Sequence, residues 1–203
     1  MDLTEESVKE FTDALASASP TPGGGGACAL AAGLGIALGD MVGAFTTGKK
    51  AYADVEEEIQ TLMHRAGKLR EELLACVEKD AVAFEPLSKA YGIPKDDPDR
   101  DAILEECLKN AAEVPMEILS LSCEAMELIR RFGEIGSRIM RSDAATGAAL
   151  CRAAIAGAAM NVKVNTKLMK DRAFADRLDA QVNEKLQTYT RIADEVFTSI
   201  YES

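Results

Sequence analysis

The sequence has few of the side chains from which metal centres are usually built. It contains one histidine, His64, and five scattered cysteines that form no C-x-x-C pair. A histidine-rich metal centre, an H-E-x-x-H motif and a paired-cysteine zinc site are therefore excluded. One histidine does not by itself exclude a Ser-His-Asp triad, but no nucleophile motif lies near it. We expect no bound metal, and free thiols in a reducing cytoplasm.

Positive charge is also in short supply. Lys and Arg number 23 against 34 Asp and Glu, which gives a net charge of −11. This balance argues against a nucleic-acid partner and against an anionic membrane surface. The uncharged stretch between Asp13 and Asp40 has an apolar part of only 13 residues, 27–39, whereas a spanning helix needs about 20. The start of the chain is acidic and does not resemble a signal peptide. We therefore expect a cytoplasmic protein without a membrane partner.

The sequence shows no sustained alternation of polar residues with Val, Ile and aromatics, which strands would require. Tryptophan is absent and aromatic residues make up 5% of the chain. The apolar spacing instead predicts an all-α fold, and a length of 203 residues fits a single domain, 1–203. The expected helices cover residues 4–17, 25–46, 51–90 with an optional restart near 80, 99–131, 142–165 and 172–201.

Small residues recur along two of these helices. On the first of them they appear every fourth residue, which makes one face smooth and lets another backbone approach closely. A later helix has a similar small face, so we expect these two helices to pack together. The residues concerned are Ala27, Ala31, Gly35, Gly39 and Gly43 on the first, and Ala145, Ala149, Ala153 and Gly157 on the second.

Other residues mark where helices should bend or begin. Pro115 lies inside an expected helix and predicts a kink or break over residues 111–114. Residues 132–137 read as a turn, and Ser142 or Asp143 as the N-cap of the next helix.

The strongest local signal is a proline- and glycine-rich stretch, residues 20–26, that opens a helix. Backbone N–H groups at a helix N-terminus bind anions, and glycines let a ligand lie against the backbone. The stretch is not a P-loop, because G-x-x-x-x-G-K-[ST] is absent. A plain turn explains it about as well as a ligand-binding loop does. The candidate residues are Pro22, Gly23, Gly24 and Gly25.

Two isolated aspartates are candidates for a site. Asp40 and Asp80 have mostly uncharged neighbours one helical turn away, so each either faces solvent or serves a site. Asn161 and Asn165 share one helix face, which is either exposed or contacts a polar ligand.

A lysine pair follows the glycine-containing helix. Lys49 and Lys50 come directly after Gly48, and this arrangement fits a simple helix C-cap better than a carboxylate-binding site.

Together these motifs resemble the cyclodeaminase/cyclohydrolase family. The resemblance rests on their order along nearly the whole chain. It departs from the family at Gly26, where the family often has serine. The matching stretches are Ser-Pro-Thr-Pro-Gly-Gly-Gly (19–25), Thr-Gly-Lys-Lys (47–50) with Tyr52, Asp-Ala-x-Ala-Phe (80–84), Pro-Lys (94–95), Ser-Asp (142–143) and Asn-Val-x-Val-Asn (161–165).

The resemblance implies a bundle of long antiparallel helices, a homodimer and a tetrahydrofolate substrate, with no further cofactor. Two reactions occur in the family. One hydrolyses 5,10-methenyltetrahydrofolate to 10-formyltetrahydrofolate, and the other releases ammonia from 5-formiminotetrahydrofolate. The length of the chain favours the cyclohydrolase, with the cyclodeaminase as the alternative. A non-catalytic helical folate-binding or assembly protein is a second alternative.

The resemblance also suggests roles for the candidate residues. The methenyl bridge is a cation, so a carboxylate can stabilise it and move a proton. The candidates are Asp80 and Asp143, followed by Asp40. Substrate-binding roles are expected for the loop (Pro22, Gly23, Gly24, Gly25), for Lys49 and Lys50 on the glutamate tail or pterin carbonyl, for Ser142, and for Asn161 and Asn165 on the pterin edge.

Overall fold

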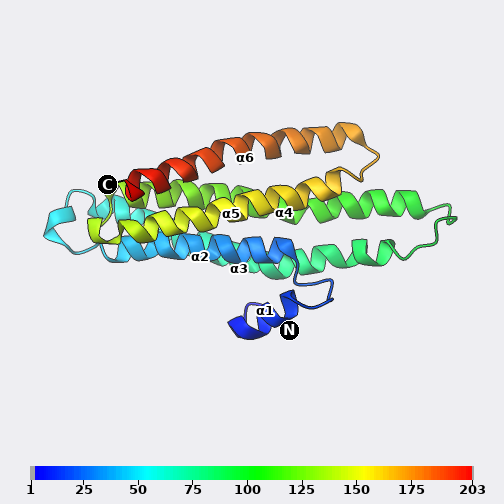
Figure 1. Ribbon diagram of the computed structural model, residues 1–203, viewed down its shortest axis with the longest axis horizontal. Coiled ribbons are helices and arrows are strands. Elements are labelled where there is room, and N and C mark those ends of the chain that lie inside the picture. The colour runs from blue at the N-terminus through cyan, green and yellow to red at the C-terminus, as the bar shows by residue number, and fades with distance from the viewer. Residues whose placement is uncertain (1–2, 203) are drawn as a thin grey trace.

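The regular structure of the part of the chain that the structure describes is helical. The structure is a computed structural model that describes residues 3–202, and no strand occurs in that range. Helices α2 to α6 form an elongated bundle in which each helix from α3 onward runs antiparallel to the one before it (Figure 1). The prediction of an all-α antiparallel bundle is therefore confirmed. The helices are α1 (Val8–Leu15), α2 (Gly24–Ala44), α3 (Glu56–Ala90), α4 (Arg100–Ile135), α5 (Arg141–Thr166) and α6 (Arg172–Tyr201), with short 3₁₀ turns at Lys50–Tyr52 and Arg138–Met140.

The first helix begins later than expected. Ser7 is its N-cap: the Ser7 side chain accepts from the Glu10 N–H, and the Glu10 side chain accepts from the Ser7 N–H. This capping box satisfies donors at both positions, which a start at Thr4 would not do.

Of the kink or break expected over residues 111–114, the break is wrong, because α4 runs through Pro115 without interruption. The helix continues to Ile135 because Phe132 and Gly133, which were expected in a turn, are buried in the bundle. The expected cap of α5 is also wrong, since the helix begins at Arg141 and Asp143 lies in its first turn.

The glycine-rich helix α2 packs against α5 at very short range, as the small residues predicted. A Cβ at Gly35 would lie 2.9 Å from the Gly147 carbonyl oxygen and 2.6 Å from Cys151 Sγ. The contact face on α5 differs from the predicted one, because Ala149 and Ala153 are exposed. The two backbones therefore touch through Gly35 and Gly147.

The bundle is not the same length throughout. The C-terminal end of α3 and the N-terminal end of α4 extend beyond the start of α2 (Figure 1). A small separate apolar cluster stabilises this overhang. A space therefore opens beside α3, α4 and α5 at the point where α2 begins. The cluster consists of Leu87, Leu108, Ala111, Ala112, Met169 and Ala175.

The outer sides of α2 and α5 carry exposed apolar side chains. Two segments, Gly24–Ala44 and Arg138–Thr166, are long and apolar enough to cross a membrane by length and composition, with 44% and 50% of their tested windows buried inside the bundle. From the sequence, the apolar part of α2 is expected to be too short to cross a membrane. By length and composition α2 passes that test, although about half of the tested window is buried in the core. We call the exposed set the outer apolar face: Leu34, Met41, Phe45, Met160, Val164 and Leu168.

Replacing Gly35 by alanine should destabilise the fold, because the added Cβ meets α5 backbone. We expect Gly35→Ala to lower the free energy of unfolding by about 1–3 kcal/mol in urea titrations. Gly67 on α3 is the matched control, since nothing lies within 4 Å of a Cβ built there. Gly67→Ala should raise the free energy of unfolding by about 0.5–1 kcal/mol. Equal effects of the two variants would contradict the close contact.

Candidate functional site

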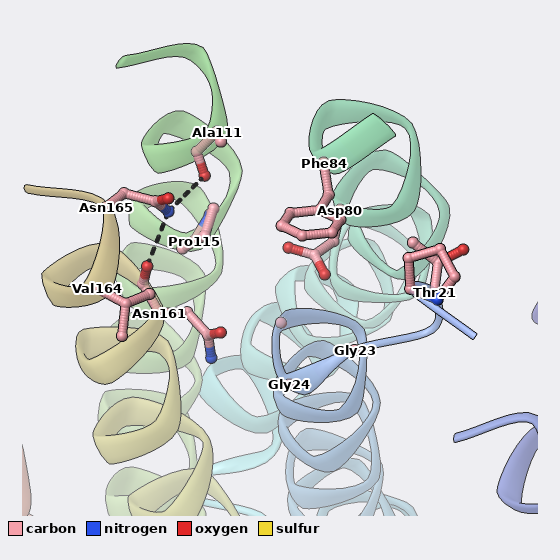
Figure 2. A pocket seen from close by; sticks show the side chains of 12 residues that line it. Thr21, Gly23, Gly24, Asp80, Phe84, Ala111, Pro115, Asn161, Val164 and Asn165 are labelled. Carbon is pink, nitrogen blue, oxygen red and sulfur yellow. Dashed lines mark hydrogen bonds between the residues drawn. The ribbon is translucent and has the colours of Figure 1, made fainter. Parts of the chain in front are cut away.

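A pocket of about 250 Å³ lies where α2 begins beside the overhang. Its walls come from the loop before α2 and from α3, α4 and α5, and Phe84, Pro115 and Val164 give it apolar sides (Figure 2). Among the residues that line it are six predicted from the sequence: Gly23, Gly24, Gly25, Asp80, Asn161 and Asn165.

Asp80 joins α3 to the N-terminus of α2. Its Oδ2 accepts a hydrogen bond from the Gly26 N–H at 3.0 Å, so it satisfies one of the donors that every helix start leaves open. Burial raises the pKa of this carboxyl group, and the Gly26 N–H opposes the shift. The carboxyl group therefore keeps its proton up to a higher pH than an exposed aspartate does.

Two glycines in the first turn of α2 differ in the side chain that each position could hold. A Cβ at Gly25 would lie 2.1 Å from Asp80 Oδ1, so only glycine leaves room for the carboxyl group. A Cβ at Gly26 would make ordinary contacts, 3.6 Å from Val77. The serine that the family often has at position 26 would therefore fit, and here Asp80 holds the loop without it.

The two asparagines lie one turn apart near the end of α5. Asn161 Nδ2 donates to the Gly157 carbonyl at 2.8 Å, and a Cβ at Gly24 would lie 3.2 Å from the Asn161 amide. Asn165 is 8% exposed, so of the two readings left open for this face, contact with the pocket is the one that the structure favours.

Cys28 lies beside Asp80 but is not part of the pocket wall. Burial, and next the charge of Asp80, raise the pKa of its thiol to about 11. The thiol therefore stays protonated and is a poor nucleophile at neutral pH.

Four of the predicted residues lie at the other end of the bundle. Lys49 and Lys50 follow the C-terminus of α2, and a helix of 21 residues rises about 30 Å. Ser142 and Asp143 start α5 at that same end (Figure 1). One copy of the chain therefore does not bring these four residues to the pocket.

The two remaining predicted residues lie outside the pocket wall. Pro22 is buried next to the glycines but does not line the pocket. Asp40 lies midway along α2, where its Oδ2 pairs with Arg70 of α3 at 3.3 Å and its Oδ1 is buried without a partner.

Sequence reasoning missed the apolar part of the pocket. Phe84 was quoted in a motif but given no role, although it lies one turn after Asp80 and so faces the same way. Pro115 was interpreted only as a helix breaker. Within residues 3–202, no group of three or more His, Cys, Asp or Glu side chains is placed to hold a metal ion.

Comparison with known proteins shows the family. The family model described as formiminotransferase-cyclodeaminase matches residues 7–184, and the chain belongs to that family. A methenyltetrahydrofolate cyclohydrolase of Methylorubrum extorquens is 38% identical over 84% of each chain. A formimidoyltransferase-cyclodeaminase of Dictyostelium discoideum is 32% identical over 91% of this chain, which spans only 34% of that longer protein.

A solved structure shows the same fold. The crystal structure described as formiminotetrahydrofolate cyclodeaminase from Thermotoga maritima matches with a TM-score of 0.85 and 29% identity, over 98% of this chain and 99% of that one. The resemblance drawn from the motifs is therefore confirmed at the level of family and fold.

The contrast between Gly25 and Gly26 tests the geometry around Asp80. Gly25→Ala should displace the carboxyl group and lower the free energy of unfolding by about 1–3 kcal/mol. Gly26→Ala should change it by no more than about 0.5 kcal/mol, because its Cβ finds ordinary contacts. Chemical denaturation of both variants measures the difference. A Gly26→Ala variant that loses as much as Gly25→Ala would contradict the placement of Asp80.

Proposed function

We propose that this protein hydrolyses 5,10-methenyltetrahydrofolate to 10-formyltetrahydrofolate. The proposal depends on one observation: among the described residues that line the pocket, Asp80 is the one with a titratable side chain. A single carboxyl group in an otherwise uncharged pocket suits a cationic reaction centre, because its field is not cancelled by neighbours. Asn161 and Asn165 offer polar atoms for the pterin, and Phe84 an apolar surface.

The proposed chemistry needs one group that takes and returns a proton. Asp80 accepts a proton from water as the water oxygen bonds to the methenyl carbon, which gives a neutral adduct. The bond from that carbon to N5 then breaks, Asp80 returns the proton to N5, and the formyl group stays on N10. The adduct's hydroxyl proton leaves to solvent, so the sum is substrate cation plus water to product plus one proton. The raised pKa of Asp80 suits both roles.

Two relatives bear on which of the family's two reactions this protein catalyses. The bacterial cyclohydrolase is more similar in sequence, at 38% identity, and of comparable length. The cyclodeaminase reaction is the alternative, supported by the Thermotoga maritima structure at 29% identity. Both reactions pass through the same methenyl compound, so the pocket suits either. The higher identity favours the cyclohydrolase.

We also propose that the working form is a cytoplasmic homodimer formed through the outer apolar face. That face exposes large side chains along α2 and α5, such as Leu34 at 53% and Met160 at 62%. Covering such a surface is favourable. The pocket lies at one end of α2 and Lys49 and Lys50 at the other, so two copies packed antiparallel bring one copy's lysines towards the other copy's pocket. The substrate's anionic glutamate tail suits those lysines.

Replacing Asp80 by asparagine tests the catalytic role. Asp80→Asn keeps an oxygen for the Gly26 N–H but removes the proton acceptor, so the turnover number should fall by about 10²- to 10⁴-fold. Loss of methenyltetrahydrofolate absorbance measures it. Asp40→Asn is the control, because Asp40 lies outside the pocket. Normal turnover by Asp80→Asn would remove Asp80 from the mechanism.

The raised pKa of Asp80 makes two pH predictions. The working base is the ionised form, so kcat/KM should fall on acidification with a midpoint above the usual aspartate value of 3.8. The free energy of unfolding should change with pH in the opposite direction. Burial favours the protonated form, so ionisation of Asp80 destabilises the folded state as pH rises. Asp80→Asn should therefore be at least as stable as the wild type at pH 7, and a large loss of stability would contradict this.

Mixing two inactive homodimers tests the shared site. A hybrid of Asp80→Asn with the double variant Lys49→Ala, Lys50→Ala contains one intact site if each site uses both copies. Random exchange of subunits should then restore up to about a quarter of wild-type activity. Sedimentation must also show a dimer. The proposal would be contradicted if the mixture recovered no activity or if the wild type sedimented as a monomer. Binding of the outer apolar face to lipid vesicles would also contradict it.

A further inference from the structure

Pro115 stands out because it is buried inside α4 and also lines the pocket. In an α-helix the carbonyl of one residue accepts from the N–H four residues later. Proline has no N–H, so the Ala111 carbonyl has no such partner at position 115. A buried carbonyl without its helical partner is costly unless another donor is present.

The donor that meets this carbonyl is the Asn165 side chain of α5. Asn165 Nδ2 donates to the Ala111 carbonyl at 3.2 Å and to the Asn161 carbonyl at 3.0 Å (Figure 2). Both partners are carbonyl oxygens, which only accept, so the nitrogen of the amide must face them. The two contacts therefore fix which way the amide is turned.

The other atom of the amide is left for the pocket. Asn165 Oδ1 accepts no hydrogen bond from residues 3–202, yet it is not among the unpartnered atoms that are sealed inside the protein, as Asp40 Oδ1 is. Asn165 itself lines the pocket. The amide therefore presents an acceptor, and not a donor, to whatever binds there.

We propose that Pro115 is a positioning residue. It leaves the Ala111 carbonyl free to hold the Asn165 amide, so that Asn165 Oδ1 accepts a hydrogen bond from an N–H group of the ligand. The identity of that ligand rests on the function proposed above. In a tetrahydropterin the amino group and the ring N–H groups are donors of this kind, so the amide selects for that edge of the ring.

The variant that tests this is Pro115→Ala, which restores an N–H opposite the Ala111 carbonyl. That N–H competes with Asn165 and frees the amide to turn. We expect KM for methenyltetrahydrofolate to rise about three- to tenfold, the effect of about one hydrogen bond, while kcat changes less than twofold. Thermal stability should not fall, because the helix regains a hydrogen bond.

Pro86→Ala is the matched control. Pro86 also lies inside a helix, α3, but it is exposed and does not line the pocket. It should leave KM unchanged. A rise in KM of the same size in both variants would attribute the effect to helix stiffness and overturn the proposal.

A double-mutant cycle distinguishes two roles of Pro115: holding the Asn165 amide in position, or only shaping the wall of the pocket. If Pro115 acts through Asn165, then Pro115→Ala should add nothing to KM in an Asn165→Ala background. If Pro115→Ala raised KM by the same factor in the wild type and in Asn165→Ala, Pro115 would act independently of the amide, and the proposal would be overturned.

The side-chain amide signals of Asn165 test the same claim without any ligand. Two hydrogen bonds to carbonyls should slow exchange of both amide hydrogens with solvent in NMR spectra of the wild type and of Pro86→Ala. Pro115→Ala should lose that protection. Unchanged protection in Pro115→Ala would overturn the proposal. A wild type that does not turn over the folate would instead refute the proposed function, and the amide signals would still decide the role of Pro115.

Discussion

The contact between the Asp80 carboxyl group and the start of α2 is the constraint on which the site depends. It supplies an acceptor to the Gly26 N–H, in a place where no side-chain cap exists on the loop itself. Burial at this position raises the pKa of the carboxyl group, and the hydrogen bond from the Gly26 N–H opposes that shift. One side chain therefore caps the helix and, in the proposed mechanism, transfers the proton. The start of α2 must have glycine at position 25 to leave room for it.

The pocket follows from unequal helix lengths together with close packing. Because the end of α3 and the beginning of α4 extend past the start of α2, the space that another turn of α2 would fill is left open as the pocket. The short approach of α2 to α5 through Gly35 and Gly147 brings the asparagines of α5 opposite the glycine loop. A bundle with larger side chains at these positions would hold the two walls of the pocket farther apart.

Much of this arrangement was predictable, since helix periodicity and the small-residue ridge gave the all-α fold and the contact of α2 with α5. Asp80, the glycine loop and the asparagine pair were singled out together and do meet. Lys49 was assigned to the site from motif order alone, although the helix expected over residues 25–46 already separates it from the glycine loop by about 30 Å. The placement of Asp143 at that far end depends on the packing of α5 against α2, which motif order does not give. The break expected at Pro115 was wrong for a related reason: the missing N–H can be read from the sequence, but the donor that replaces it at the Ala111 carbonyl comes from α5.

The most direct test of the account follows the absorbance of 5,10-methenyltetrahydrofolate after purified protein is added, with ammonia release from 5-formiminotetrahydrofolate measured alongside. The account predicts that the methenyl band disappears faster than without protein and that no ammonia is released. Ammonia release with growth of the methenyl band would establish the cyclodeaminase reaction instead. A folded protein that changes neither signal would contradict the enzymatic account and favour a folate-binding or assembly role.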